Sequence, residues 1–276
     1  MDKTQKRRSF LKSVVLGGTG VAISPNILKA GEPADIVDTK NNGQQKAQVT
    51  NRKYNSSYTG EYLNRVAFPI GGLGAGMFCL EGSGAISHMS VRNRPDIYNE
   101  PSLFSAIAIK GLPNGVKVLE GQVPDWKMFG ARGTGNGAAG TTYGLPRFQK
   151  AEFRTHFPFG TIQLEDSDIP LQITVKGWST FIPTDEDNSS LPAGALEYTF
   201  TNKTTHSIEA VFSFNTKNFM MNTDGAVNKI ASTKNGFVLK QDAVKVKPEA
   251  EGSFAIFTND DNTVVDHCWF RGGWWD

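Results

Sequence analysis

Apolar and polar residues alternate with a period of two in short runs along most of the chain. Such alternation is typical of β-strands that bury one face, and Gly, Pro, Asn and Asp separate the runs at roughly 10-residue spacing. Strands are predicted at residues 76–80, 104–109, 171–175, 196–200, 208–214, 236–239 and 253–257. No amphipathic helix pattern of about 11 residues follows the first segment of the chain. We therefore predict an all-β fold, a large antiparallel β-sandwich of two stacked sheets.

The composition of the chain divides it into three parts. Residues 1–30 are basic and then weakly apolar, residues 31–64 are mostly polar, and residues 65–276 carry the strand pattern. We predict a leader, a polar linker or arm, and one sandwich domain over these three ranges. Within the sandwich, residues 130–144 are rich in Gly and form either a lid over a ligand or a plain surface insertion.

The leader carries paired arginines, Arg7 and Arg8, followed by Phe-Leu-Lys and a short apolar stretch over residues 13–23. This pattern resembles a bacterial twin-arginine export signal, and the alternative is a basic amphipathic helix on a membrane surface. The apolar stretch is too short and too rich in Gly for a stable membrane anchor. We expect export by the twin-arginine machinery to the periplasm or the extracellular space.

Charge and cysteine usage exclude several classes of protein. The net charge is +2, and residues 1–30 hold six basic residues against one acidic residue, so the remainder has a net charge of −3. This balance gives no support to nucleic-acid binding.

The cysteines and histidines show no pattern of a metal site. Cys79 and Cys268 are far apart in the sequence, and they form either two buried free thiols or one disulfide. The four histidines have no metal-ligand spacing, so we expect neither a metal site nor a cofactor.

Residues 71–76 read Gly-Gly-Leu-Gly-Ala-Gly and superficially suggest a phosphate-binding loop. The spacing of the glycines does not fit the dinucleotide fingerprint, and a strand rather than a helix follows. We therefore predict a backbone that packs tightly against another segment or turns with positive φ.

Carboxylates and tryptophans are the remaining candidates for carbohydrate chemistry. Glycoside hydrolysis needs two carboxylates a few ångströms apart, and no pair is evident in the sequence. Five carboxylates in turn-like contexts are expected to face water: Asp125, Glu152, Asp166, Asp185 and Glu186. Tryptophans can stack on sugar rings, but core packing accounts for most of them. Asn93, Arg94 and Trp126 are our candidates for the rim of a substrate pocket.

Several blocks together resemble the N-terminal domain of glycoside hydrolase family 116, the family of non-lysosomal glucosylceramidase and bacterial β-glucosidases. The blocks occur in order over most of the chain, at residues 68–76 with 82–84 and 91–95, 143–148 with 157–160, 164–171, 177–183 with 189–192, and 269–276. Thr180 departs from the pattern, since the family usually has Pro before Phe-Ile-Pro. The resemblance implies a β-sandwich followed by an (α/α)6 helical barrel that holds the catalytic Glu and Asp.

That resemblance implies retaining hydrolysis of β-glucosides by the complete enzyme. No catalytic residue carries over to this chain, which is expected to be inactive alone. The aromatic C-terminal block is expected to contact the helical domain, through Trp269, Arg271, Trp274 and Trp275. Two other functions stay open: a stand-alone carbohydrate-binding or structural sandwich without catalysis, and hydrolysis by a carboxylate pair within the sandwich itself.

Overall fold

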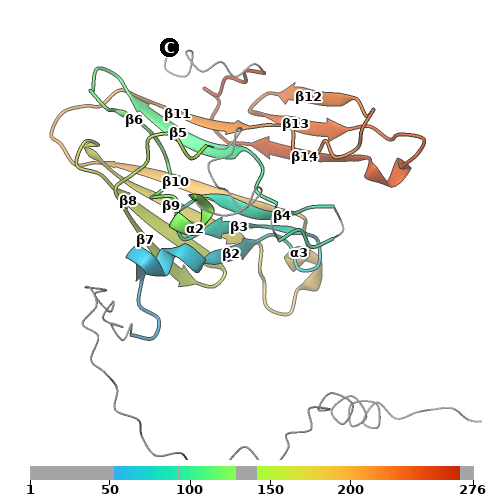
Figure 1. Cartoon of the computed structure of the whole chain (residues 1–276), viewed down its shortest axis with the longest axis horizontal. Helices are drawn as coiled ribbons and strands as arrows, with labels where there is room; N and C mark the ends of the chain where they lie inside the picture. The colour runs from blue at the N-terminus through green and yellow to red at the C-terminus, as the bar shows by residue number, and fades with distance from the viewer. Residues whose placement is uncertain (1–52, 93, 98, 129–141, 268–276) are drawn as a thin grey trace, which may run out of the picture. The chain divides into compact units, whose positions relative to one another are not determined.

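The structure is a computed structural model that describes residues 53–92, 94–97, 99–128 and 142–267. These residues form antiparallel sheets joined by loops, with helical segments of three to six residues (Figure 1). The prediction of an all-β antiparallel fold is therefore confirmed. No helix of the described residues is long and apolar enough to cross a membrane.

The described strands form four sheets. The large sheet has the order β1-β7-β8-β9-β10, with β1 (Tyr58–Thr59), β7 (Lys150–His156), β8 (Phe159–Glu165), β9 (Leu171–Ser179) and β10 (Gly194–Asn202). A second sheet contains β2 (Ala67–Ile70), β3 (Met77–Glu81) and β4 (Ile86–Ser90). A third has the order β11-β5-β6, with β11 (Ala210–Thr216), β5 (Leu103–Ile109) and β6 (Val116–Val118). The fourth contains β12 (Asn228–Thr233), β13 (Gly236–Gln241) and β14 (Gly252–Phe257).

Short helices lie between these strands. They are η1 (Gly60–Arg65), α2 (Asp125–Met128), α3 (Glu186–Ser189) and η2 (Pro248–Ala250). At the start of α3 the side chain of Asp185 accepts a hydrogen bond from the Asn188 N–H, which caps the helix.

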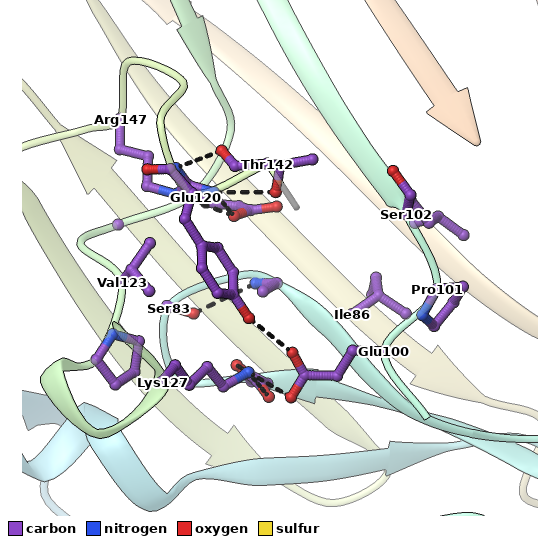
Figure 2. A pocket seen from close by; sticks show the side chains of 16 residues that line it. Ser83, Ile86, Glu100, Pro101, Ser102, Glu120, Val123, Lys127, Thr142 and Arg147 are labelled. Carbon is purple, nitrogen blue, oxygen red and sulfur yellow. Dashed lines mark hydrogen bonds and ion pairs between the residues drawn. The ribbon is translucent and has the colours of Figure 1, made fainter. Parts of the chain in front are cut away.

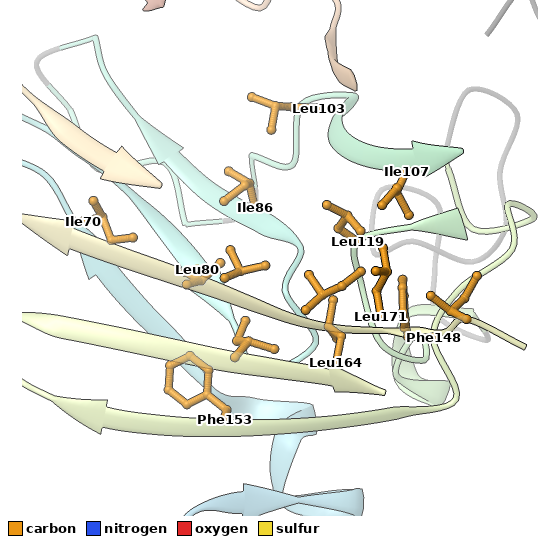
Figure 3. Close-up of a cluster of buried hydrophobic side chains, with 14 of the residues drawn as sticks. Ile70, Leu80, Ile86, Leu103, Ile107, Leu119, Phe148, Phe153, Leu164 and Leu171 are labelled. Atoms are coloured by element: carbon orange, nitrogen blue, oxygen red, sulfur yellow. The ribbon is translucent and has the colours of Figure 1, made fainter. Parts of the chain in front are cut away.

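The main hydrophobic core joins the large sheet to the second and third sheets (Figure 3). β9 shows why: every second residue is buried, as in Leu171, Ile173 and Val175. Such alternation directs one face of the strand into the core and leaves the other nearer to solvent. Ile70 of β2 and Ile107 of β5 belong to the same core cluster. The two predicted layers are thus present, but the layer opposite the large sheet is divided between two smaller sheets.

β5 departs from simple alternation, since all seven of its residues are buried. Ile107 faces the main core, while Phe104 and Ala106 pack with Val118 of β6 in a separate small cluster. The strand is therefore covered on both faces.

The fourth sheet was not expected as a separate unit. It is joined to the sandwich by Arg92, whose guanidinium donates to the carbonyls of Met220 and Ala250. The rings of Phe219 and Phe254 also meet edge to face, with centroids 5.0 Å apart. Arg92, in the loop after β4, thus binds the segments that precede β12 and β14, and the two rings add a second contact.

The sandwich begins before residue 65. β1 pairs with β7, and the ring of Tyr58 lies 6.2 Å from that of Phe153 in the core. Residues 58 and 59 of the predicted arm are therefore part of the large sheet, and the last residues of the arm form η1. Residues 31–52 of the arm, the leader and Cys268 lie outside the described residues. Cys79 is a buried free thiol, and burial together with Glu81 raises its pKa to about 11.

Candidate functional site

Five charged side chains surround a small cavity of about 80 Å³ (Figure 2). We call them the charged cluster, and they are Glu81, Glu100, Glu120, Lys127 and Arg147. They come from the end of β3, the loops before β5 and after β6, helix α2, and the loop before β7. Residues far apart in the chain are therefore brought together by the sandwich fold.

Lys127 is the centre of one half of the cluster. It is 2% exposed, and its Nζ lies 2.6 and 2.8 Å from the two carboxylate oxygens of Glu81 and 2.8 Å from Oε1 of Glu100. The Tyr143 hydroxyl donates to the second oxygen of Glu100 at 3.0 Å. Burial, together with the Glu100 carboxylate, raises the pKa of Tyr143 well above its usual value. Tyr143 therefore stays protonated and remains a donor at neutral pH.

Arg147 organises the other half. Its Nε and Nη2 lie 3.2 and 3.1 Å from Oε2 of Glu120, and its Nη1 donates to the carbonyls of Thr142, Tyr143 and Leu145. Burial raises the pKa of Glu120, and the ion pair with Arg147 opposes that rise. Each polar group of this half has a partner, which is the condition for burying charge without a large cost.

The geometry of the cluster suits a structural role better than catalysis. Each of the three carboxylates has a partner, Lys127 for Glu81 and Glu100 and Arg147 for Glu120, which leaves none poised as a free acid or nucleophile. Ligand pockets usually measure roughly 300–1,000 Å³, so this cavity has the size for ordered water rather than a sugar ring. No group of metal-ligating side chains occurs in the part of the chain that the structure describes.

Trp126 lies beside the cluster but does not line the cavity. Its indole N–H donates to the carbonyl of Asn64 at 2.9 Å, and the guanidinium of Arg65 lies 4.9 Å from its ring. These contacts join α2 to η1. Arg94 forms a surface ion pair with Asp96 at 3.7 Å and does not line the cavity.

The other predicted site residues lie outside the described residues, and their roles stay predictions. They are Asn93, the interface residues Trp269, Arg271, Trp274 and Trp275, and the leader residues Arg7 and Arg8.

The glycine loop at residues 71–76 forms a second notable site, because it meets two other sequence blocks. Gly71 N–H donates to the Ser179 hydroxyl and Leu73 N–H donates to the Ser189 carbonyl, both at 2.9 Å. Gly74 and Gly76 have φ values of +74° and +98°. The prediction of close packing and positive φ is thus confirmed, and the loop is followed by strand β3.

Comparison with protein families gives a match over most of the chain. A family model described as "beta-glucosidase 2, glycosyl-hydrolase family 116 N-term" matches residues 67–272, which is most of the chain. The chain belongs to this family. A comparison with curated proteins gave no match.

Exposed apolar side chains lie on the glycine loop of this family 116 N-terminal domain and on the segments that follow β7 and β9. We call them the loop patch, and they are Leu73, Phe157, Phe181, Ile182 and Leu191, each between 37% and 61% exposed. The rings of Phe157 and Phe181 meet edge to face at 4.9 Å, and Ile182 is bonded through its backbone to the Ser189 hydroxyl. Exposed apolar side chains that gather in this way are typical of an interaction surface.

Sequence reasoning located neither the charged cluster nor the loop patch. Glu81 and Lys127 are 46 positions apart in the sequence, and no local sequence pattern predicts the buried ion pair that they form. Asp166 was expected to face water, but it is buried and ion-paired with Lys117 at 2.7 Å. For the loop patch a signal existed in the sequence, since the glycine loop and residues 177–183 with 189–192 are both among the family blocks.

Replacing Gly72 with alanine is expected to lower the free energy of unfolding by about 1–3 kcal/mol, the usual cost of overpacking. A Cβ at this position would lie 2.1 Å from the carbonyl oxygen of Leu191, so backbone would have to move. Urea unfolding of both proteins measures the difference. Gly144→Ala is the control, because a Cβ there meets nothing within 4 Å. A stability loss no larger than that of the control contradicts the tight packing of this loop.

Proposed function

We propose that this chain is the β-sandwich domain of an exported glycoside hydrolase whose complete form hydrolyses β-glucosides with retention. The family match over residues 67–272 is the observation that carries the proposal, and its description includes a β-glucosidase. In this proposal the acid and nucleophile belong to a helical catalytic domain, and the sandwich supports that domain.

The charged cluster and the loop patch both support the proposal that the sandwich has a structural role and that a second domain is catalytic. The carboxylates of the charged cluster are held by Lys127 and Arg147, so the cluster stiffens the sandwich. The loop patch offers exposed apolar side chains of the kind that a second domain covers. The C-terminal residues Trp269, Arg271, Trp274 and Trp275, which lie outside the described residues, are also predicted to contact that domain.

The test is hydrolysis of an aryl β-glucoside by the chain alone and by the chain combined with a helical catalytic domain of family 116. We expect no turnover by the chain alone and turnover with retained configuration in the combined protein. Equal activity in both samples would mean that the sandwich holds its own carboxylate pair. Sugar binding without hydrolysis in either sample would instead favour a stand-alone carbohydrate-binding module.

A further inference from the structure

Among the described residues β11 is an edge strand, and one set of its backbone hydrogen-bonding groups has no partner there. It pairs with β5 on one side, and no other described strand pairs with it. Lys217 N–H donates to the Ser102 carbonyl, and the Glu209 carbonyl accepts from Lys110. Backbone direction alternates in antiparallel strands, so the odd-numbered residues of β11 face β5 and the even-numbered residues point to the free edge.

The sequence of β11 lacks the usual protection of an edge strand. Charged residues, Pro and bulges normally prevent such strands from pairing with another chain. The seven residues Ala-Val-Phe-Ser-Phe-Asn-Thr over 210–216 contain no charge, no Pro and no Gly.

The side chain of Phe212, which lies between β11 and the large sheet, is also exposed to solvent at this edge. Its ring faces the large sheet, where its centroid lies 4.8 Å from that of Tyr198 and 5.9 Å from that of Phe200. Despite these contacts Phe212 is 42% exposed and Phe200 is 36% exposed. Apolar rings that lie between two layers and remain exposed indicate a place that a further strand would cover.

The strand is nearly symmetric about Ser213. Phe212 and Phe214 lie one residue to either side of it, and beyond the strand Glu209 and Lys217 lie four residues to either side. In an antiparallel pair of two such strands centred on Ser213, Phe212 of each copy would lie opposite Phe214 of the other. Glu209 of each copy would lie opposite Lys217 of the other, so both ends would be complementary in charge.

We propose that two copies of this chain associate through β11, antiparallel about a two-fold axis at Ser213. This register places even-numbered residues opposite even-numbered residues, so the free N–H and C=O groups of each strand meet those of the other. The pairing joins the two β11-β5-β6 sheets into one six-stranded sheet, as in other isologous interfaces. Cross-strand aromatic pairs and opposite charges both stabilise such a contact.

Two other edge strands fit this pairing less well. β10 carries Glu197 within the strand. β14 is uncharged over residues 252–257, but Glu251 precedes it and Asp260 follows it. Self-pairing of β14 would therefore bring together ends of the same sign.

Sedimentation velocity of the full chain over a range of concentrations tests the proposal. We expect a reversible dimer for the natural sequence. Glu209→Lys should raise the dimer dissociation constant at least about tenfold, because it places lysines opposite Lys217 of the second copy. The double variant Glu209→Lys/Lys217→Glu should return the constant to within about threefold of the natural value, because it restores opposite charges with their positions exchanged.

Lys110→Gln is the matched control. It removes the exposed pair between Lys110 and Glu209, 3.0 Å apart within one copy, and leaves the free edge intact, so it should leave the dissociation constant unchanged. A monomer at every concentration overturns the proposal, and so does a dimer that the exchange does not weaken and restore. Hydrogen exchange adds a second readout: the amides of Phe212 and Phe214 should gain protection as concentration rises. Protection that is already complete in a monomer would show that another segment of the chain covers β11.

Discussion

Lys127→Met is expected to lower the free energy of unfolding by about 3–5 kcal/mol, the usual cost of breaking a buried ion pair. The methionine side chain fills nearly the same space but leaves Glu81 buried without its cation. The wild-type ammonium lies within 2.8 Å of both Glu81 oxygens and of Glu100, and almost no water reaches it. Urea unfolding at neutral pH measures the loss.

Two further variants separate the charge effect from simple loss of packing. Lys110→Met removes a lysine that forms an ion pair with Glu209 on the surface, where both side chains are exposed. This substitution should change the free energy of unfolding by no more than about 0.5 kcal/mol. The double variant Lys127→Met/Glu81→Gln should be more stable than Lys127→Met alone, because the more deeply buried of the two carboxylates that Lys127 pairs with is then neutral. If the double variant is no more stable, the loss comes from packing and the charge account is wrong.

Alternation in the sequence predicted the strands because most of them bury a single face. In β9 the pattern is clean, with Leu171, Ile173 and Val175 buried and the residues between them partly exposed. The pattern predicted the strand β5 but not which of its faces lies in the main core. A strand that is covered on both faces has no polar side. The sequence pattern also did not predict that the second layer is divided into two sheets, because this division depends on contacts between distant segments.

The candidate sites were harder to predict for a different physical reason. A charged residue in a turn normally faces water, and that rule misplaced Asp166. Burial of a carboxylate depends on whether the fold supplies donors, here Lys117 on β6 and two backbone N–H groups. The local sequence around a carboxylate does not predict which distant lysine or arginine will form an ion pair with it. The glycine loop was more predictable, since a run of glycines is typical of close backbone packing or positive φ, although its contact with Leu191 was not predicted.

Asp166 links the two layers of the sandwich, and its contribution should depend on pH. Its carboxylate lies 2.7 Å from Lys117 of β6 and accepts hydrogen bonds from the N–H groups of Gln149 and Asp168. Burial by itself would raise the pKa of Asp166, but these donors outweigh that effect and lower it below its usual value. Because the folded pKa is lowered, the stabilisation is fully present above the unfolded pKa of about 3.9 and is lost as pH falls through the folded value.

Asp166→Asn should therefore lower the free energy of unfolding by about 3 kcal/mol at pH 7, the low end for a buried pair, because Asp168 remains 3.7 Å from Lys117. The difference between the two proteins should shrink as pH falls below about 4, since protonation removes the same charge from the wild type. Urea unfolding across this pH range measures it. Asp261→Asn is the control: Asp261 also has a lowered pKa, through Lys234 and Asn235, but it lies on the surface, where solvent screens the pair. A pH-independent difference for Asp166→Asn would show that its hydrogen bonds matter and its charge does not.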